Sequence, residues 1–204
     1  MVDLGTSRPT KATPRWRKLV PILGTMNDDP QDLDKATNDQ PDPASAQLTA
    51  TAYHEAGHAV MALSLGRLIQ KVTIQPGRSQ FGETRLGVCE IRKGRSKASR
   101  SLRQDEVLIL FAGMVAEARF TGQYCQSGAT QDLLAIKRLL QDRATSESQA
   151  ERLQRRLLDK TEHLLRDEGH VRAIELIAGE LIQNTTISGR AARHFFEQAL
   201  KQVS

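Results

Sequence analysis

The stretch TAYHEAGHAVMALSLG, residues 51–66, puts two histidines and a glutamate into a run made otherwise mostly of Ala, Val, Met and Leu. Thr49 or Thr51 is a suitable N-cap for a helix, and Gly66 suits the position just beyond its C-terminus. We therefore expect an amphipathic helix here. Gly57 lies in its middle, where glycine costs about 1 kcal/mol relative to alanine, so we expect another helix or a sheet to approach the backbone closely there.

His54, Glu55 and His58 form the pattern H-E-x-x-H within this helix. Side chains four residues apart project from one helix face, about 6 Å apart along the axis, so both imidazoles can reach a single zinc ion. Glu55 points along the flank of that face, where it can take a proton from a water molecule on the metal, as in zinc metalloproteases. The alternative is a helical core that holds two neutral, hydrogen-bonded histidines.

A catalytic zinc ion needs a third protein ligand and one open position for water. The remaining histidines, His163, His170 and His194, and the carboxylates are the candidates by residue type. These histidines are scattered over helical segments, and we expect them to be exposed. No histidine follows His58 closely, so the extended pattern H-E-x-x-H-x-x-G-x-x-H is absent.

The composition indicates one ordinary domain with an aliphatic core, because 39% of the 204 residues are hydrophobic and only 4% are aromatic. A net charge of +5 is too small to indicate nucleic acid, and no aromatic residue interrupts the basic run at 92–103. We therefore expect no nucleic-acid partner, and a solvated loop or a docking site for an acidic partner at this run. Cys89 and Cys125 do not form a zinc motif.

Two absences bear on the location of the protein. The chain has no run of about 18 apolar residues, so we expect no transmembrane segment. Its start lacks the apolar region of a secretory signal. A cytoplasmic protein is the simplest expectation. An organellar transit peptide stays open, because Asp3 is the one acid among the first 24 residues.

Residues 1–48 contain six of the seven prolines, and their acidic part has no periodic apolar face. Such a segment cannot bury enough apolar surface to offset the entropy lost on ordering. We expect a disordered, Pro-rich and acidic leader over 1–48 and a folded domain over 49–204.

Within the folded domain, alternating apolar residues predict strands at 71–75 and 85–91. The remaining pattern is helical, with helices expected from Ser101 to Gly122, from about Thr130, and over most of the chain after Ser146, with breaks at Gly169 and in NTTISG (184–189) and with Ser188 as the last cap. The expected fold is mainly α, with a small β-sheet inserted after the first helix.

Five segments in order, YHEAGHAVMALSLG, KVTIQP, LGVCEI, LFAGMVAEARFTG and SGATQDLLAIKRLL, resemble the peptidase domain of the FtsH-type ATP-dependent zinc metalloproteases. The resemblance covers essentially residues 49–204. It implies a helical, zincin-like peptidase domain that holds one Zn2+ per chain.

The resemblance also assigns roles to residues. His54, His58 and Asp132 would ligate zinc, and Glu55 would be the general base. Glu117 would accept a hydrogen bond from a ligand histidine and fix its ring. The alternatives are a solvated helix charge for Glu117 and, for Asp132, a first-turn aspartate that the helix dipole favours.

The chain departs from the family at several points. It contains no G-x-x-x-x-G-K-[ST] phosphate loop and no membrane anchor, and its turn reads A-T-Q-D instead of A-S-N-D. A peptidase without an unfolding motor can take peptides or unfolded proteins, unless an AAA-type ATPase partner feeds it. The family implies a homo-oligomer, a hexamer, and a partner could bring the chain to a membrane surface as a peripheral protein.

The expected function is that of a zinc metalloendopeptidase, in which Glu55 deprotonates the zinc-bound water. Gly87 and Val88, in the second predicted strand, would pair with the substrate main chain. Two alternatives stay open: a zinc-stabilised, non-catalytic regulator or binding module of full-length FtsH-type proteases, and a non-proteolytic zinc hydrolase. Only an enzyme has a use for Glu55.

Overall fold

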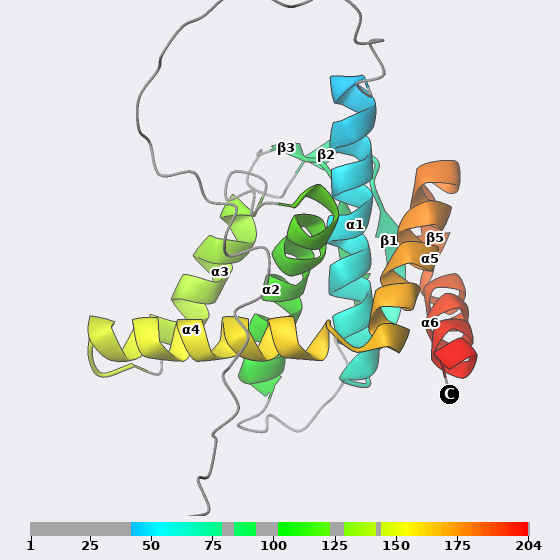
Figure 1. Ribbon diagram of the computed structural model, residues 1–204. Coiled ribbons are helices and arrows are strands. Elements are labelled where there is room, and N and C mark those ends of the chain that lie inside the picture. The colour runs from blue at the N-terminus through cyan, green and yellow to red at the C-terminus, as the bar shows by residue number, and fades with distance from the viewer. Residues whose placement is uncertain (1–41, 79–83, 93–101, 123–128, 142–143, 204) are drawn as a thin grey trace, which may run out of the picture. The chain divides into compact units, whose positions relative to one another are not determined.

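The computed structural model describes residues 42–78, 84–92, 102–122, 129–141 and 144–203, which all lie in one compact unit, Gln40–Ser204. Most of the basic run at 92–103 (residues 93–101), Cys125 and nearly all of the expected leader lie outside these residues. The described part is mainly helical with a small sheet, as predicted (Figure 1). Its helices are α1 (Pro43–Ser64), α2 (Leu102–Thr121), α3 (Thr130–Gln141), α4 (Glu147–Leu164), α5 (Glu168–Asn184) and α6 (Gly189–Val203). Its strands are β1 (Ile69–Thr73), β2 (Gly77–Arg78), β3 (Thr84–Arg85), β4 (Val88–Ile91) and β5 (Thr186–Ser188).

Helix α1 begins at Pro43, before the predicted start at Thr49 or Thr51. Proline suits the first turn of a helix because its φ angle is already helical and its missing N–H is not needed there. The hydroxyls of Thr49 and Thr51 donate instead to carbonyls four residues earlier, at 2.8 and 2.9 Å. The predicted end is confirmed, since Gly66 follows the helix with a φ of 72°.

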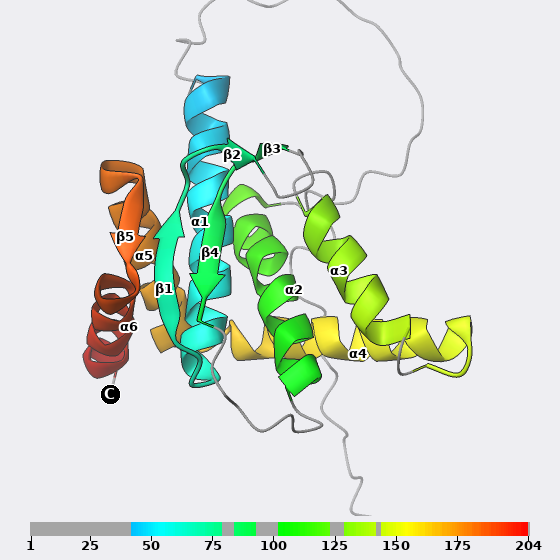
Figure 2. The ribbon, with the colours of Figure 1, turned by 180° about the vertical axis from the view of Figure 1, so that it is seen from behind.

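Helix α1 is the centre of the fold, and it is buried nearly all round instead of on one face as the predicted amphipathic helix would be. Every residue from Ala50 to Leu63 except Tyr53 is buried. Helices α2 and α5 flank α1, and the sheet covers a further side (Figures 1 and 2). Small side chains make this possible: a Cβ atom on Gly57 would lie 2.6 Å from Cβ of Ala116 and would also meet the Ala112 carbonyl. The predicted close approach at Gly57 is therefore confirmed, and α2 makes it.

The sheet is antiparallel with the order β4-β1-β5 (Figure 2). Both predicted strands exist, with shifted or shorter bounds. The break in the helical pattern predicted at 184–189 is confirmed, because α5 ends at Asn184 and α6 begins at Gly189. The strand β5 inside this break was not predicted, and it pairs Ile187 with Val72. Three residues are too few to show an alternating pattern, and β5 exists because β1 offers it a backbone edge. Among the described strands β4 pairs on one side only, so its other edge is unpaired.

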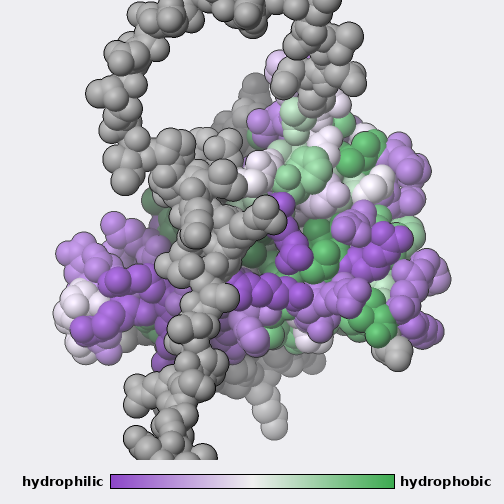
Figure 3. All heavy atoms as spheres, in the orientation of Figure 1, coloured by the Kyte–Doolittle hydropathy of each residue, from purple (hydrophilic) through white to green (hydrophobic). Residues whose placement is uncertain are grey.

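Each of the three C-terminal helices begins just after a residue whose side chain caps it. Ser146 accepts from the N–H of Gln149 at the start of α4, and Ser188, the predicted last cap, accepts from that of Ala191 at the start of α6. The break expected at Gly169 lies earlier in the chain, because Asp167 caps α5 and Gly169 sits in its first turn. Hydrophilic side chains gather along α4 on the face in Figure 3. No helix in the described ranges has the length and apolar character needed to cross a bilayer.

Candidate metal centre

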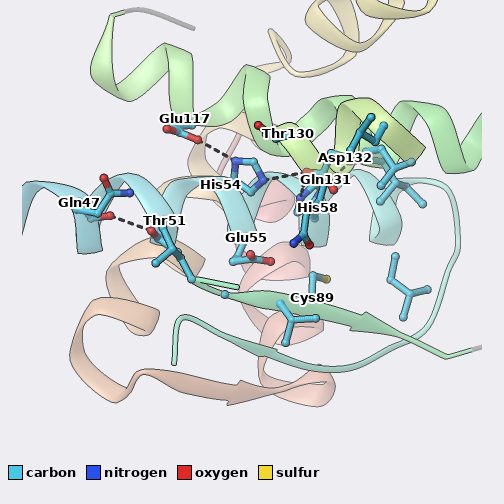
Figure 4. Close-up of a pocket in the computed structure, with 17 residues that line it drawn as sticks. Gln47, Thr51, His54, Glu55, His58, Cys89, Glu117, Thr130, Gln131 and Asp132 are labelled. Carbon is cyan, nitrogen blue, oxygen red and sulfur yellow. Dashed lines mark hydrogen bonds and ion pairs between the residues drawn. The ribbon is translucent and has the colours of Figure 1, made fainter. Parts of the chain in front are cut away.

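Three side chains from two distant parts of the chain converge at one point (Figure 4). Nε2 of His54 lies 3.1 Å and Nε2 of His58 lies 3.2 Å from Oδ2 of Asp132. The histidines come from the buried middle of α1, and Asp132 comes from the first turn of α3. These are the three residues that the sequence analysis names as metal ligands, and the fold brings all of them together.

The other ring nitrogens of both histidines have partners on α2. Nδ1 of His54 lies 2.8 Å from Oε2 of Glu117, and Nδ1 of His58 lies 2.7 Å from the carbonyl oxygen of Ile109. A carbonyl or a carboxylate only accepts, so each Nδ1 carries the proton and donates. A neutral ring with its proton on Nδ1 presents a bare lone pair on Nε2. With both rings neutral, the two Nε2 lone pairs would therefore face the Asp132 carboxylate.

Two imidazole lone pairs and a carboxylate oxygen are three acceptors without a donor between them. Such a group requires a cation, which is either a proton on a ring or a metal ion. Two nitrogens and one oxygen are also the donor set of catalytic zinc sites. The residues present thus fit a zinc ion.

The charges of the site agree with this need for a cation. Burial alone would lower the pKa of His54, but hydrogen bonds to Asp132 and Glu117 outweigh it and raise the value to about 10. Burial likewise opposes a rise at His58, yet the Asp132 charge raises its pKa. Burial would raise the pKa of Asp132, but His58 and His54 hold it well below its usual range. The site therefore attracts positive charge strongly.

Glu55 lies beside the ligand group and on the sheet side of α1 (Figure 4). Its side chain is buried. A Cβ atom on Gly87 would lie 2.7 Å from Oε1 and 2.8 Å from Cγ of Glu55. The carboxyl group therefore packs directly against the backbone that leads into β4.

A cavity of about 470 Å³ opens onto these residues. Glu55, Glu117 and Asp132 bring three carboxylates to its wall, and none of the described residues that line it is Lys or Arg. The rest of the wall is largely apolar and comes from α1, β4, α2, α3 and the residues that flank them. Its larger apolar side chains are Leu86, Val88, Ile91, Ile109, Leu110 and Leu134. Gly87 and Val88, the predicted substrate-binding residues, lie in this wall.

The other candidate ligands lie elsewhere. His163 and His194 are exposed, as expected, but His170 is half-buried. Its Nδ1 donates to the Leu164 carbonyl at 2.8 Å, which closes the end of α4. Cys89 lies in the cavity wall, where burial raises its pKa. Among the described His, Cys, Asp and Glu residues, only His54, His58 and Asp132 form a group that could hold a metal ion.

Gly113 is a site residue that the sequence analysis missed. It lies in α2, and a Cβ atom there would be 2.5 Å from Nε2 of His58 and 2.6 Å from Nε2 of His54. A glycine inside a helix was the available signal, the same one that marks Gly57. That signal does not say which neighbour Gly113 faces, because this depends on the tertiary fold.

Comparisons with known proteins agree with this geometry. The family model of peptidase family M41 matches residues 43–160, more than half of the chain. The chain is 38% identical over 85 residues to a protein from Protochlamydia amoebophila named ATP-dependent zinc metalloprotease FtsH, over 41% of this chain and 9% of the relative. It is 31% identical over 108 residues to ATP-dependent zinc metalloprotease FtsH 3 of Synechocystis, over 52% of this chain and 18% of the relative.

The matched part is thus less than a fifth of either relative's length. The part of the chain that the family model matches contains α1, with both histidines and Glu55, and reaches past Asp132 into α4. The chain belongs to peptidase family M41, and its folded part is an FtsH-type peptidase domain.

Proposed function

We propose that this chain is a zinc-dependent metalloendopeptidase that hydrolyses peptide bonds in peptides or unfolded proteins. One observation carries the proposal: three acceptor atoms of His54, His58 and Asp132 converge beside the buried carboxyl group of Glu55. A purely structural metal site has no use for such a carboxylate.

In the proposed site, Nε2 of His54, Nε2 of His58 and Oδ2 of Asp132 hold one Zn2+ per chain. Zinc, when bound, lowers the pKa of a coordinated water and polarises the scissile carbonyl. The pairing of Nδ1 of His54 with Glu117 fixes that ring and its tautomer, and the Ile109 carbonyl does the same for His58.

Glu55 moves the protons of the reaction. It accepts a proton from the attacking water and delivers it to the amine that leaves. Its contact with the backbone at Gly87 holds the carboxyl group at the cavity wall. The task of the protein is then to keep this carboxylate and the metal ligands in one fixed arrangement.

The substrate lies extended along β4. Gly87 and Val88 stand where β4 begins, and the outer edge of this strand is unpaired among the described strands. An extended peptide can add to such an edge through main-chain hydrogen bonds. A cavity of about 470 Å³ admits a few side chains and no folded domain, so we propose peptides or unfolded chains as substrates.

Delivery of the substrate is a further part of the proposal. The two relatives are named ATP-dependent, and the chain matches only a small share of each. We propose that the domain alone acts on peptides and unfolded proteins, and on folded proteins when an AAA-type ATPase partner feeds it, in a homo-oligomer such as a hexamer.

The test is zinc analysis together with cleavage of an unfolded protein by the wild type and by Glu55→Gln. We expect one zinc per chain in both proteins and cleavage only by the wild type. Zinc without cleavage by the wild type would favour the non-catalytic regulator. Cleavage of small amides or esters, with unfolded protein left intact, would favour a non-proteolytic hydrolase.

A further inference from the structure

Gly113 faces the metal-binding nitrogens from α2. A Cβ atom on it would lie 2.5 Å from Nε2 of His58, 2.6 Å from Cε1 of the same ring and 2.6 Å from Nε2 of His54. Non-bonded carbon atoms reach their best separation at about 3.5–4.0 Å. Even a methyl group at position 113 would therefore press on both rings at once.

The rings cannot move aside freely. Nδ1 of His54 is bound to Glu117 and Nδ1 of His58 to the Ile109 carbonyl, at 2.8 and 2.7 Å. Both histidines are 8% exposed, and the two rings contact each other edge to face at 4.7 Å between centroids. A shift that frees space for a methyl group would break one of these hydrogen bonds or move the Nε2 atoms away from Asp132.

The backbone of α2 gives no other reason for glycine at this position. Gly113 is helical, and among the described glycines only Gly66 and Gly122 have a positive φ. Alanine is the better residue inside a helix. The choice of glycine therefore follows from what lies opposite it.

We propose that Gly113 is a positioning residue that keeps the space beside the two Nε2 atoms open for the metal ion. The inference rests on the proposed function, since it presumes that the ligand group holds zinc. It adds a requirement on α2: the helix that orients the histidine rings must also lack a side chain where it faces them.

The test compares Gly113→Ala with Gly179→Ala. Gly179 lies inside α5, and a Cβ atom there meets nothing within 4 Å, so this control makes the same change without a clash. Zinc content after dialysis is measured by mass spectrometry, and affinity by competition with a chromogenic chelator. We expect about one zinc per chain in the wild type and in Gly179→Ala, and an affinity on the order of 100-fold lower, or worse, in Gly113→Ala.

The outcomes separate the two proposals. Equal zinc affinity in the wild type and Gly113→Ala would overturn the role of Gly113 and leave the proposed function intact. A wild type that binds no zinc at all would overturn both.

A second measurement covers the case in which Gly113→Ala folds poorly. The same substitution is made in the variant that carries His54→Ala and His58→Ala, and urea midpoints are compared without metal. We expect Gly113→Ala to lower the midpoint when the rings are present and to raise it, as alanine does in an open helix site, when they are absent. A similar fall in both backgrounds, or no recovery of folding without the rings, would overturn the inference.

Discussion

Nδ1 of His54 lies 2.8 Å from Oε2 of Glu117, although 63 positions separate the two residues in the chain. The bond joins the first central helix to the second, and both side chains are buried. It fixes which nitrogen of His54 is protonated, and so which nitrogen is available to a metal ion. We therefore propose that Glu117 would act on a bound metal through the His54 ring and not as a ligand itself.

We expect Glu117→Ala to lower zinc affinity by roughly 10–100-fold, because the His54 ring loses the partner that orients it. Glu117→Gln keeps an oxygen acceptor and should lose less. Zinc affinity measured with a competing chelator checks both values. An exposed charge elsewhere is the control, for example Glu151→Ala on α4. If Glu117→Ala bound zinc like this control, Glu117 would be an ordinary helix charge.

Asp132→Ala should abolish zinc binding, because two imidazoles alone leave the site without its negative ligand. A first-turn aspartate also stabilises its helix through the dipole, by about 0.3–1 kcal/mol. Glu147 occupies the first turn of α4, is exposed, and belongs neither to the ligand group nor to the cavity wall, so Glu147→Ala isolates the dipole effect. Zinc loss in Asp132→Ala but not in Glu147→Ala would show a ligand, and equal retention would show a dipole partner only.

The parts of the site that lie close in sequence could be predicted from it. Helical spacing alone puts His54 and His58 on one face, and Gly66 marks the helix end. The meeting of these histidines with Asp132 could not be derived that way, because their contact spans 78 positions and depends on how α3 docks. Only the resemblance to a known family pointed to Asp132.

The other differences between the predicted and the observed fold also have physical causes. The helix pattern of α1 predicted one apolar face, but Ala and Gly side chains are small enough for neighbours to pack on every side. Pro43 marked a leader by composition, whereas proline is also a good first residue of a helix. Strand β5 is too short for its own pattern and needs β1 beside it. The packing around α1 and the strand β5 thus depend on partners that the local sequence does not contain, whereas Pro43 is a local signal with two possible meanings.

Gly87→Ala separates two roles that the structure allows for this residue. A methyl group there would meet Oε1 of Glu55 at 2.7 Å, so the carboxyl group must move. We expect zinc content to stay unchanged and kcat to fall by roughly 10–100-fold, because a misplaced base transfers protons poorly. Gly77→Ala, where a Cβ atom meets nothing within 4 Å, is the control. A raised KM with an unchanged kcat would instead assign Gly87 to substrate binding alone.

Zinc binding should release protons, and its affinity should rise with pH from 6 to 9. The reason is the pKa of His54, which is raised to about 10 when no metal neutralises the site, together with the raised pKa of His58. Between pH 6 and 9 the His54 ring therefore carries a proton that zinc must displace, and the raised pKa of His58 acts in the same direction. Competition from protons weakens as the pH rises. Calorimetric titration of the metal-free protein with zinc, in two buffers of different ionisation enthalpy, counts the protons released. Binding heats that do not depend on the buffer would contradict protonated rings in the metal-free site.

Zinc should also stabilise the fold, because it binds the native state. At 100 times its Kd, zinc should raise the free energy of unfolding in urea by about 2.7 kcal/mol, and a chelator should remove that gain. An unchanged urea midpoint would contradict zinc binding to the native fold.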